Sequence, residues 1–136
     1  MTMTEEQWAR GLEVFDQVYG PGASEMTRPY KDKPFNQEIV ANQFGNLWGN
    51  PALSIRDKRL MVLGATAMLG RADLVEIQMT GALANDEFTD EQLDFIPLFL
   101  LFYAGAGNTT ALFRGIEAAR AKSRAAANTS PDPIVR

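Results

Sequence analysis

The sequence predicts an all-α protein. Apolar side chains recur every three or four residues along most of the chain, as at Trp8, Leu12 and Phe15, which is the spacing of a helix face. Thr4 with Gln7, and Thr89 with Gln92, have the spacing of capping boxes that begin helices. We find no run of alternating apolar and polar residues long enough for a strand. The helical spacing and the lack of strand patterns therefore both favour the all-α class.

Each helix is expected between recognisable breaks. The first begins after Thr4, and a loop rich in proline and glycine follows over residues 19–34. Further helices are expected at Phe35–Trp48, at Ile55–Leu69 with Ser54 as N-cap, over residues 71–83, from Asp90 through Tyr103, and from Thr109 to about Ala126. We therefore expect one helical domain over residues 1–126 and a flexible C-terminal tail over residues 127–136.

Composition excludes several partners and chemistries. The net charge is −4, which argues against binding to nucleic acid or to anionic membranes. The N-terminus lacks the apolar run of a signal peptide, and the longest apolar stretch, around Pro97, is too short to cross a bilayer, so a soluble, cytoplasmic protein is expected. The sequence has no cysteine and no histidine, so acid–base chemistry would depend on Asp, Glu, Lys or Tyr. We expect no metal and no cofactor, and we attribute the acids of "NDEFTDEQLD" to a helix start.

The chain contains more apolar helix surface than a small monomer covers easily. The helix at Ile55–Leu69 has only Thr66 as a polar residue after Arg59, and the helix after Asp90 is apolar on all sides. Self-association would bury this surface. The alternative is that the first two helices cover it within one chain.

Gln78 lies in the apolar stripe of its helix. Its helical neighbours three or four residues away are Leu74, Val75, Gly81 and Ala82. A buried amide needs hydrogen-bond partners. Two interpretations remain open: Gln78 faces a ligand or water in a pocket, or it is a structural amide paired with other protein groups.

Residues 44–112 carry a family resemblance. The matching pieces are Trp48 before a turn containing Pro51, Arg56 with Arg59, "LGR" at 69–71, "GAL" at 81–83, the helix start at 89–91 and "YAG" at 103–105. In order and spacing they resemble the carboxymuconolactone decarboxylase family, which is related to the alkylhydroperoxidase AhpD. The resemblance implies an AhpD-like helical subunit that assembles into trimers or hexamers with small-molecule pockets.

The chain departs from the family at polar positions. Where family members often carry Glu, His and Arg, this sequence has Asn46, Gln78 and Thr80, and a later His or Gln is replaced by Phe99. The thiol peroxidase chemistry of the AhpD relatives is excluded because it needs a Cys pair.

The resemblance and the helical phase together select the candidate site. Gln78 and Tyr103 are the candidate catalytic residues, although a buried Tyr often only tethers a helix. Arg56 and Arg59 would clamp a carboxylate bidentately, or, alternatively, Arg59 would pair with a nearby acid. The candidate substrate-binding residues are Asn46, Trp48, Arg59, Thr80 and Phe99.

Three functions remain open at this stage. The first is a decarboxylase-like lyase acting on a small lactone or carboxylic acid in aromatic catabolism. The second is a non-catalytic, oligomeric small-molecule-binding protein that has lost the acid–base residues of the family. The third is a scaffold without a ligand.

Overall fold

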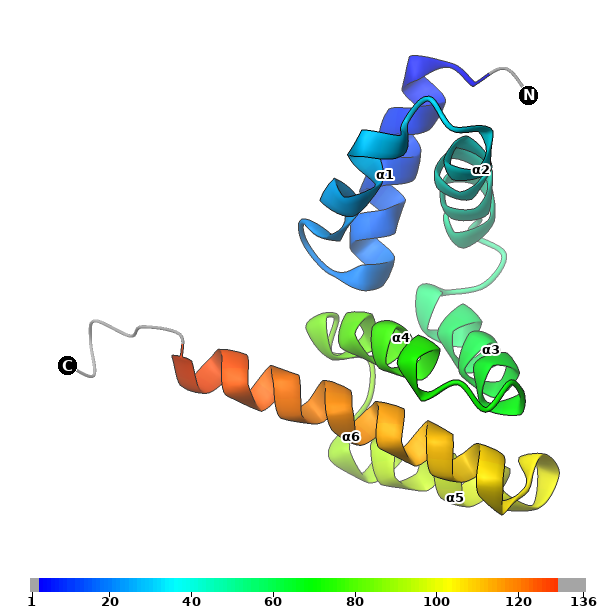
Figure 1. Ribbon diagram of the computed structural model, residues 1–136, viewed down its shortest axis with the longest axis vertical. Helices are drawn as coiled ribbons and strands as arrows, with labels where there is room; N and C mark the ends of the chain where they lie inside the picture. Colours follow the sequence, from blue (N-terminus) through cyan, green and yellow to red (C-terminus); the bar gives the residue numbers. More distant parts are fainter. Residues whose placement is uncertain (1–2, 130–136) are drawn as a thin grey trace.

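The computed structural model describes residues 3–129 and confirms the all-α class, since this part of the chain contains no strand. Figure 1 shows two groups of helices, one formed by the N-terminal third and one by the rest. Their bounds, in chain order, are α1 (Glu5–Tyr19), η1 (Ala23–Tyr30), α2 (Pro34–Gln37), η2 (Glu38–Trp48), α3 (Ile55–Met68), α4 (Ala72–Ala84), α5 (Asp90–Ala104) and α6 (Ala106–Thr129).

The N-terminal group is a pair of closely packed helices, α1 and η2. A Cβ atom added at Gly11 would collide with the main chain of Val40, so only glycine allows this approach. Phe15, Phe44 and Trp48 fill the space between the two helices, with Phe15 and Phe44 ring centroids 4.5 Å apart.

The C-terminal group is built around α4, which packs against α3 and α6, while α5 packs along α6 (Figure 1). A Cβ at Gly115 would lie 2.6 Å from Val75, so this glycine sets the close crossing of α4 and α6. The core here is mostly aliphatic and includes Leu63, Met79 and Leu112.

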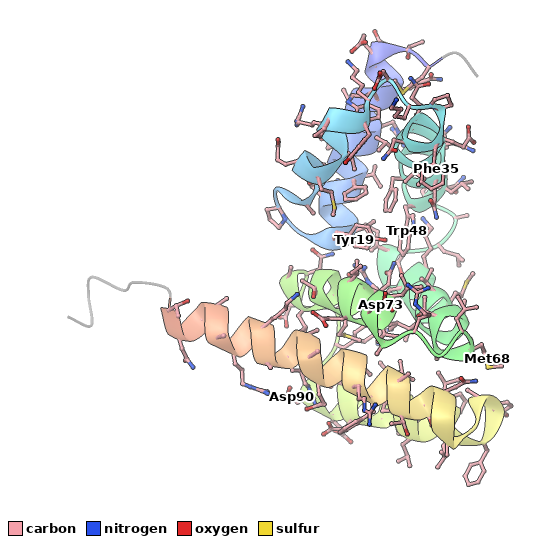
Figure 2. All side chains as sticks on the ribbon, in the orientation of Figure 1. Tyr19, Phe35, Trp48, Met68, Asp73 and Asp90 are labelled. Atoms are coloured by element: carbon pink, nitrogen blue, oxygen red, sulfur yellow. The ribbon has the colours of Figure 1, made fainter. Side chains whose placement is uncertain are left out.

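The two groups meet where the end of α1 packs on α4. A Cβ at Gly81 would overlap the carbonyl oxygen of Val18, so α4 is in direct contact with the main chain of α1 at this point. Figure 2 shows Tyr19 and Trp48 at this junction, at the ends of α1 and η2 that face α3 and α4.

Both capping boxes and the Ser54 cap form as the sequence predicts. Other boundaries differ. The expected loop over residues 19–34 contains the 3₁₀ helix η1, in which the hydroxyl of Thr27 donates to the carbonyl oxygen of Ser24. The expected helix at Phe35–Trp48 is mostly a π-helix, η2, and this wider winding was not predicted.

The last helix is longer than expected. It begins at Ala106 and continues through Thr129, so residues 127–129, assigned from the sequence to the flexible tail, are helical. The rest of that predicted tail, residues 130–136, lies outside the described residues.

The apolar helices are less buried in a single chain than their sequences suggest. Within α5 only Leu93 is buried. The side chain of Phe102 is 93% exposed and that of Tyr103 is 76% exposed. The exposed large apolar side chains of α3 and α5 are Leu60, Met61, Met68, Phe95, Leu98, Phe99, Phe102 and Tyr103. No helix within residues 3–129 combines the length and hydrophobicity that crossing a bilayer requires.

Candidate functional site

A buried polar cluster lies at the junction of the two helix groups. Its centre is Arg59 of α3, whose side chain is 0% exposed. The guanidinium holds the carboxylate of Glu87 by two hydrogen bonds, from Nε to Oε1 at 3.1 Å and from Nη2 to Oε2 at 2.9 Å. Nη2 also donates to the carbonyl oxygen of Val18 at 2.6 Å. The cluster therefore connects α1, α3 and the turn before α5.

Gln78 belongs to this cluster and is buried, as the helical phase predicts. Its Oε1 accepts from Nη1 of Arg59 at 3.0 Å, and its Nε2 donates to the hydroxyl of Tyr19 at 3.1 Å. Among the described residues, no buried side-chain nitrogen or oxygen lacks a hydrogen-bond partner. The amide is thus paired within its own chain, which agrees with the structural alternative for Gln78.

Tyr19 is a partly buried member of the cluster. Burial raises the pKa of its hydroxyl, while the nearby charge of Arg59 and the hydrogen bond from Gln78 lower it to a smaller extent. Tyr19 is therefore neutral at neutral pH and serves as a polar partner for the amide. Trp48 covers the cluster from the η2 side, with its ring centroid 5.6 Å from Cζ of Arg59.

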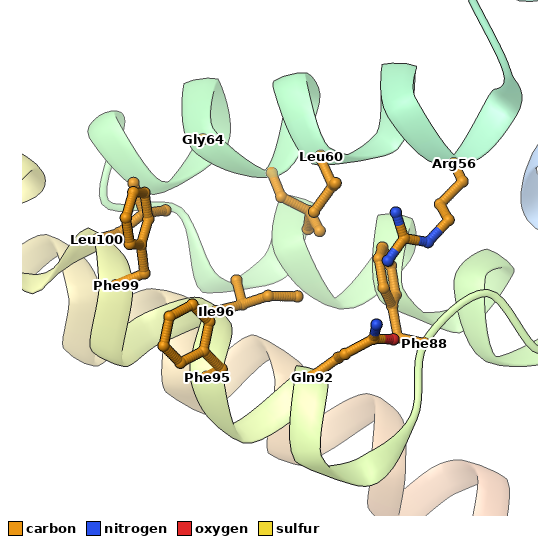
Figure 3. Close-up of a pocket in the computed structure, with 10 residues that line it drawn as sticks. Arg56, Leu60, Gly64, Phe88, Gln92, Phe95, Ile96, Phe99 and Leu100 are labelled. Atoms are coloured by element: carbon orange, nitrogen blue, oxygen red, sulfur yellow. The ribbon is translucent and has the colours of Figure 1, made fainter.

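A separate pocket lies between α3 and α5 (Figure 3) and has a volume of about 430 Å³. Arg56 and Gln92 lie at one end of it, beside Phe88. The rest of the lining is apolar or glycine: Leu60, Leu63, Gly64, Phe95, Ile96, Phe99 and Leu100. Gln78 is not part of this lining, so the polar cluster and the pocket are two different places.

The structure brings three of the predicted site residues together and separates the others. Gln78, Arg59 and Trp48 meet in the polar cluster. Phe99 lines the α3–α5 pocket, and Tyr103 lies beside it on α5 with the two ring centroids 5.7 Å apart.

Asn46 and Thr80 lie elsewhere on the surface. Asn46 is exposed and donates to Asn42 on the same helix. Thr80 is exposed, and its hydroxyl donates to the carbonyl oxygen of Glu76. The predicted catalytic pair, Gln78 and Tyr103, is therefore divided between a closed interior and an exposed helix end.

Sequence reasoning missed Glu87 as the partner of Arg59 and Tyr19 as a partner of Gln78. Glu87 was attributed to a helix start, and no local pattern connects it with Arg59, 28 positions away. A nearby acid was expected as an alternative partner of Arg59, but it was not identified as Glu87. Gln92 was recognised as a cap but not as part of a pocket.

The described residues contain no group of three or more Asp and Glu side chains arranged to hold a metal ion. Comparison of the chain with protein-family models, with curated proteins and with solved structures gives no match.

Proposed function

We propose that this chain is a self-associating small-molecule-binding protein and that the α3–α5 pocket is its binding site. The observation that carries the proposal is the pocket itself. Its volume of about 430 Å³ lies within the range of small-molecule sites, and its lining is apolar except at one end. The relationship to carboxymuconolactone decarboxylases, suggested by the motifs over residues 44–112, is part of the same proposal.

Binding is favoured over catalysis because the pocket lacks a proton donor. Its polar side chains are Arg56 and Gln92, and neither exchanges a proton at neutral pH. At the position where the family carries His, Gln78 is held by Arg59 and Tyr19. The lyase hypothesis is therefore the weaker one. It predicts release of CO₂ from carboxymuconolactone, and we expect none in an assay with the purified protein.

Self-association is supported by the exposed apolar side chains of α3 and α5. Phe95, Phe99 and Tyr103 follow each other along one face of α5, and Phe102 projects into solvent. Contiguous apolar surface of this kind is typical of protein interfaces rather than of monomer surfaces. We propose that a second copy of the chain covers this face, in a trimer or hexamer as the resemblance implies.

Light scattering after size exclusion tests the assembly. We expect a mass three or six times that of the 15.0 kDa chain. Phe102→Lys should dissociate the assembly without unfolding the chain, because this side chain makes almost no contact within it. Phe35→Lys, at an exposed aromatic of α2, is the control and should leave the mass unchanged. A parent protein that sediments as a single chain would contradict the self-association proposal.

Gly64 allows a direct test of binding. A Cβ at Gly64 meets no atom within 4 Å, so Gly64→Leu would fill the pocket without a backbone clash. We expect 4-phenylbutan-1-ol, a neutral apolar probe, to raise the melting temperature of the parent and not that of Gly64→Leu. Gly107→Leu is the control, since Gly107 is equally free of neighbours but lies outside the pocket lining. Equal shifts in all three proteins would place binding elsewhere, and no shift in the parent would refute the binding site.

A further inference from the structure

Among the described residues, Arg56 is a cation without an acidic partner, and it lies at one end of an apolar pocket. Its Nε donates to the main-chain carbonyl oxygen of Glu87 at 3.0 Å, and its Cζ lies 4.8 Å from the ring centroid of Phe88. These two contacts hold the guanidinium in place. Within residues 3–129, no carboxylate lies within salt-bridge distance of Arg56 and neither of its Nη atoms has a hydrogen-bond partner.

Gln92 presents a second donor at the same end. Its Oε1 accepts from the backbone N–H of Thr89 at 2.9 Å, as part of the capping box that begins α5. A backbone N–H can only donate, so the oxygen of the amide must face Thr89 and the Nε2 group remains for another partner. Figure 3 shows this nitrogen directed toward the side of the pocket where Arg56 and Phe88 lie.

Both polar groups at this end are therefore donors, and one of them is charged. A group that accepts hydrogen bonds and carries negative charge satisfies both, and a planar carboxylate matches the fork of a guanidinium. The remaining lining, including Leu60, Ile96 and Phe99, offers only apolar contact to the rest of a ligand.

We propose that the pocket selects apolar monocarboxylates. The carboxylate accepts hydrogen bonds from the Nη groups of Arg56 and from Nε2 of Gln92, and the alkyl or aryl body lies between α3 and α5. This inference rests on the proposed small-molecule binding at the same pocket and specifies its ligand class.

A pair of compounds with one carbon skeleton tests the inference. Titration calorimetry with 4-phenylbutyrate and 4-phenylbutan-1-ol compares a carboxylate with a neutral hydroxyl. We expect the parent to bind the carboxylate about tenfold more tightly, or more, because charge-assisted hydrogen bonds are stronger than neutral ones. Arg56→Gln should remove this preference while retaining affinity for the alcohol, and Arg56→Lys should retain part of it.

Arg71→Gln is the matched control, because it removes the same charge from an exposed position outside the pocket. It should leave the preference intact. Equal loss in Arg71→Gln and Arg56→Gln would mean that net charge alone attracts the anion, which overturns the inference.

The remaining outcomes separate the two proposals. If the parent binds both compounds equally, the carboxylate inference fails and small-molecule binding stands. If the parent binds neither, the proposed function fails with it. Binding that is seen only in the dissociated Phe102→Lys variant would show that another copy of the chain occupies the groove, which also overturns the inference.

Discussion

Arg56 and Arg59 lie one turn apart on α3 and have opposite surroundings. Arg59 is fully buried at the helix junction, with its guanidinium held by Glu87, Gln78 and the carbonyl oxygen of Val18. Arg56 is half-buried at the end of the apolar pocket, with both Nη groups free of partners in the described part of the chain. The comparison shows that the surroundings of an arginine, and not its residue type, decide its role. Arg59 is structural because every nitrogen of its guanidinium donates to a protein acceptor. Within the same described part, Arg56 has unpaired donors, which are available to a ligand.

The two regions share one residue. Glu87 accepts from Arg59 through its carboxylate and from Arg56 through its main-chain carbonyl oxygen. The buried ion pair therefore fixes the turn against which the pocket arginine is placed. Loss of this ion pair should therefore reach the pocket, whereas a change confined to the pocket should leave the ion pair intact.

Replacement of each arginine by methionine should give the largest difference in stability between the polar cluster and the pocket. Arg59→Met leaves the carboxylate of Glu87 buried without its partner, and we expect a loss of about 3–5 kcal/mol in the free energy of unfolding. Arg56→Met removes one hydrogen bond and one ring contact, and should cost about 1 kcal/mol. Urea denaturation measures both, and similar costs would show that the two arginines are not different in kind.

Replacing one glycine in each region by alanine compares how tightly the helix junction and the pocket are packed. Gly81→Ala places a Cβ against the carbonyl oxygen of Val18 and 3.0 Å from Nη1 of Arg59, so we expect destabilisation of about 1–3 kcal/mol. Gly64→Ala enters open space on a helix and should stabilise the chain by up to about 1 kcal/mol. Melting temperatures that move in the same direction would argue against the close contact at the junction.

Gln78→Ala distinguishes the two interpretations of this amide. It leaves Nη1 of Arg59 without its partner, and we expect a cost of about 1–3 kcal/mol with unchanged binding of 4-phenylbutan-1-ol. Thr80→Ala, at an exposed position of the same helix, should change stability by less than about 0.5 kcal/mol. A Gln78→Ala variant of normal stability that no longer binds the probe would make Gln78 a ligand contact after all.

Tyr19→Phe should give the smallest effect, about 1 kcal/mol near neutral pH, because it removes one hydrogen bond. Its pH dependence is more informative. Since burial raises the pKa of this hydroxyl, the folded chain retains a proton that the unfolded chain releases near its ordinary value of about 10. The free energy of unfolding should therefore fall as the pH rises from about 10 through the folded pKa.

Tyr19→Phe should lack that part of the fall, so the stability difference between the two proteins narrows at alkaline pH. Denaturant titrations between pH 9 and about 11 measure it. A constant difference over this range would show that the hydroxyl of Tyr19 is not held neutral by burial.

The elements of the fold were predictable where the signal is local. Thr4 and Thr89 cap helices with Gln7 and Gln92, and each capping box involves residues only three apart. The 3₁₀ helix η1 and the π-helix η2 were not predicted, because no residue spacing in the sequence distinguishes their winding from that of an α-helix. The burial of Gln78 followed from helical phase, but its partners did not.

The sequence by itself determined the helical class, the capped helix starts and the absence of thiol and imidazole chemistry, since these depend on residue identity and short spacings. Only the tertiary structure decided that Arg59 is saturated and that, within residues 3–129, the Nη groups of Arg56 are unpaired, because Glu87 reaches Arg59 across 28 positions of chain. It also decided that Phe99 lines a pocket while Gln78 does not. Such contacts arise when separate helices pack, and no local pattern encodes the distance between them.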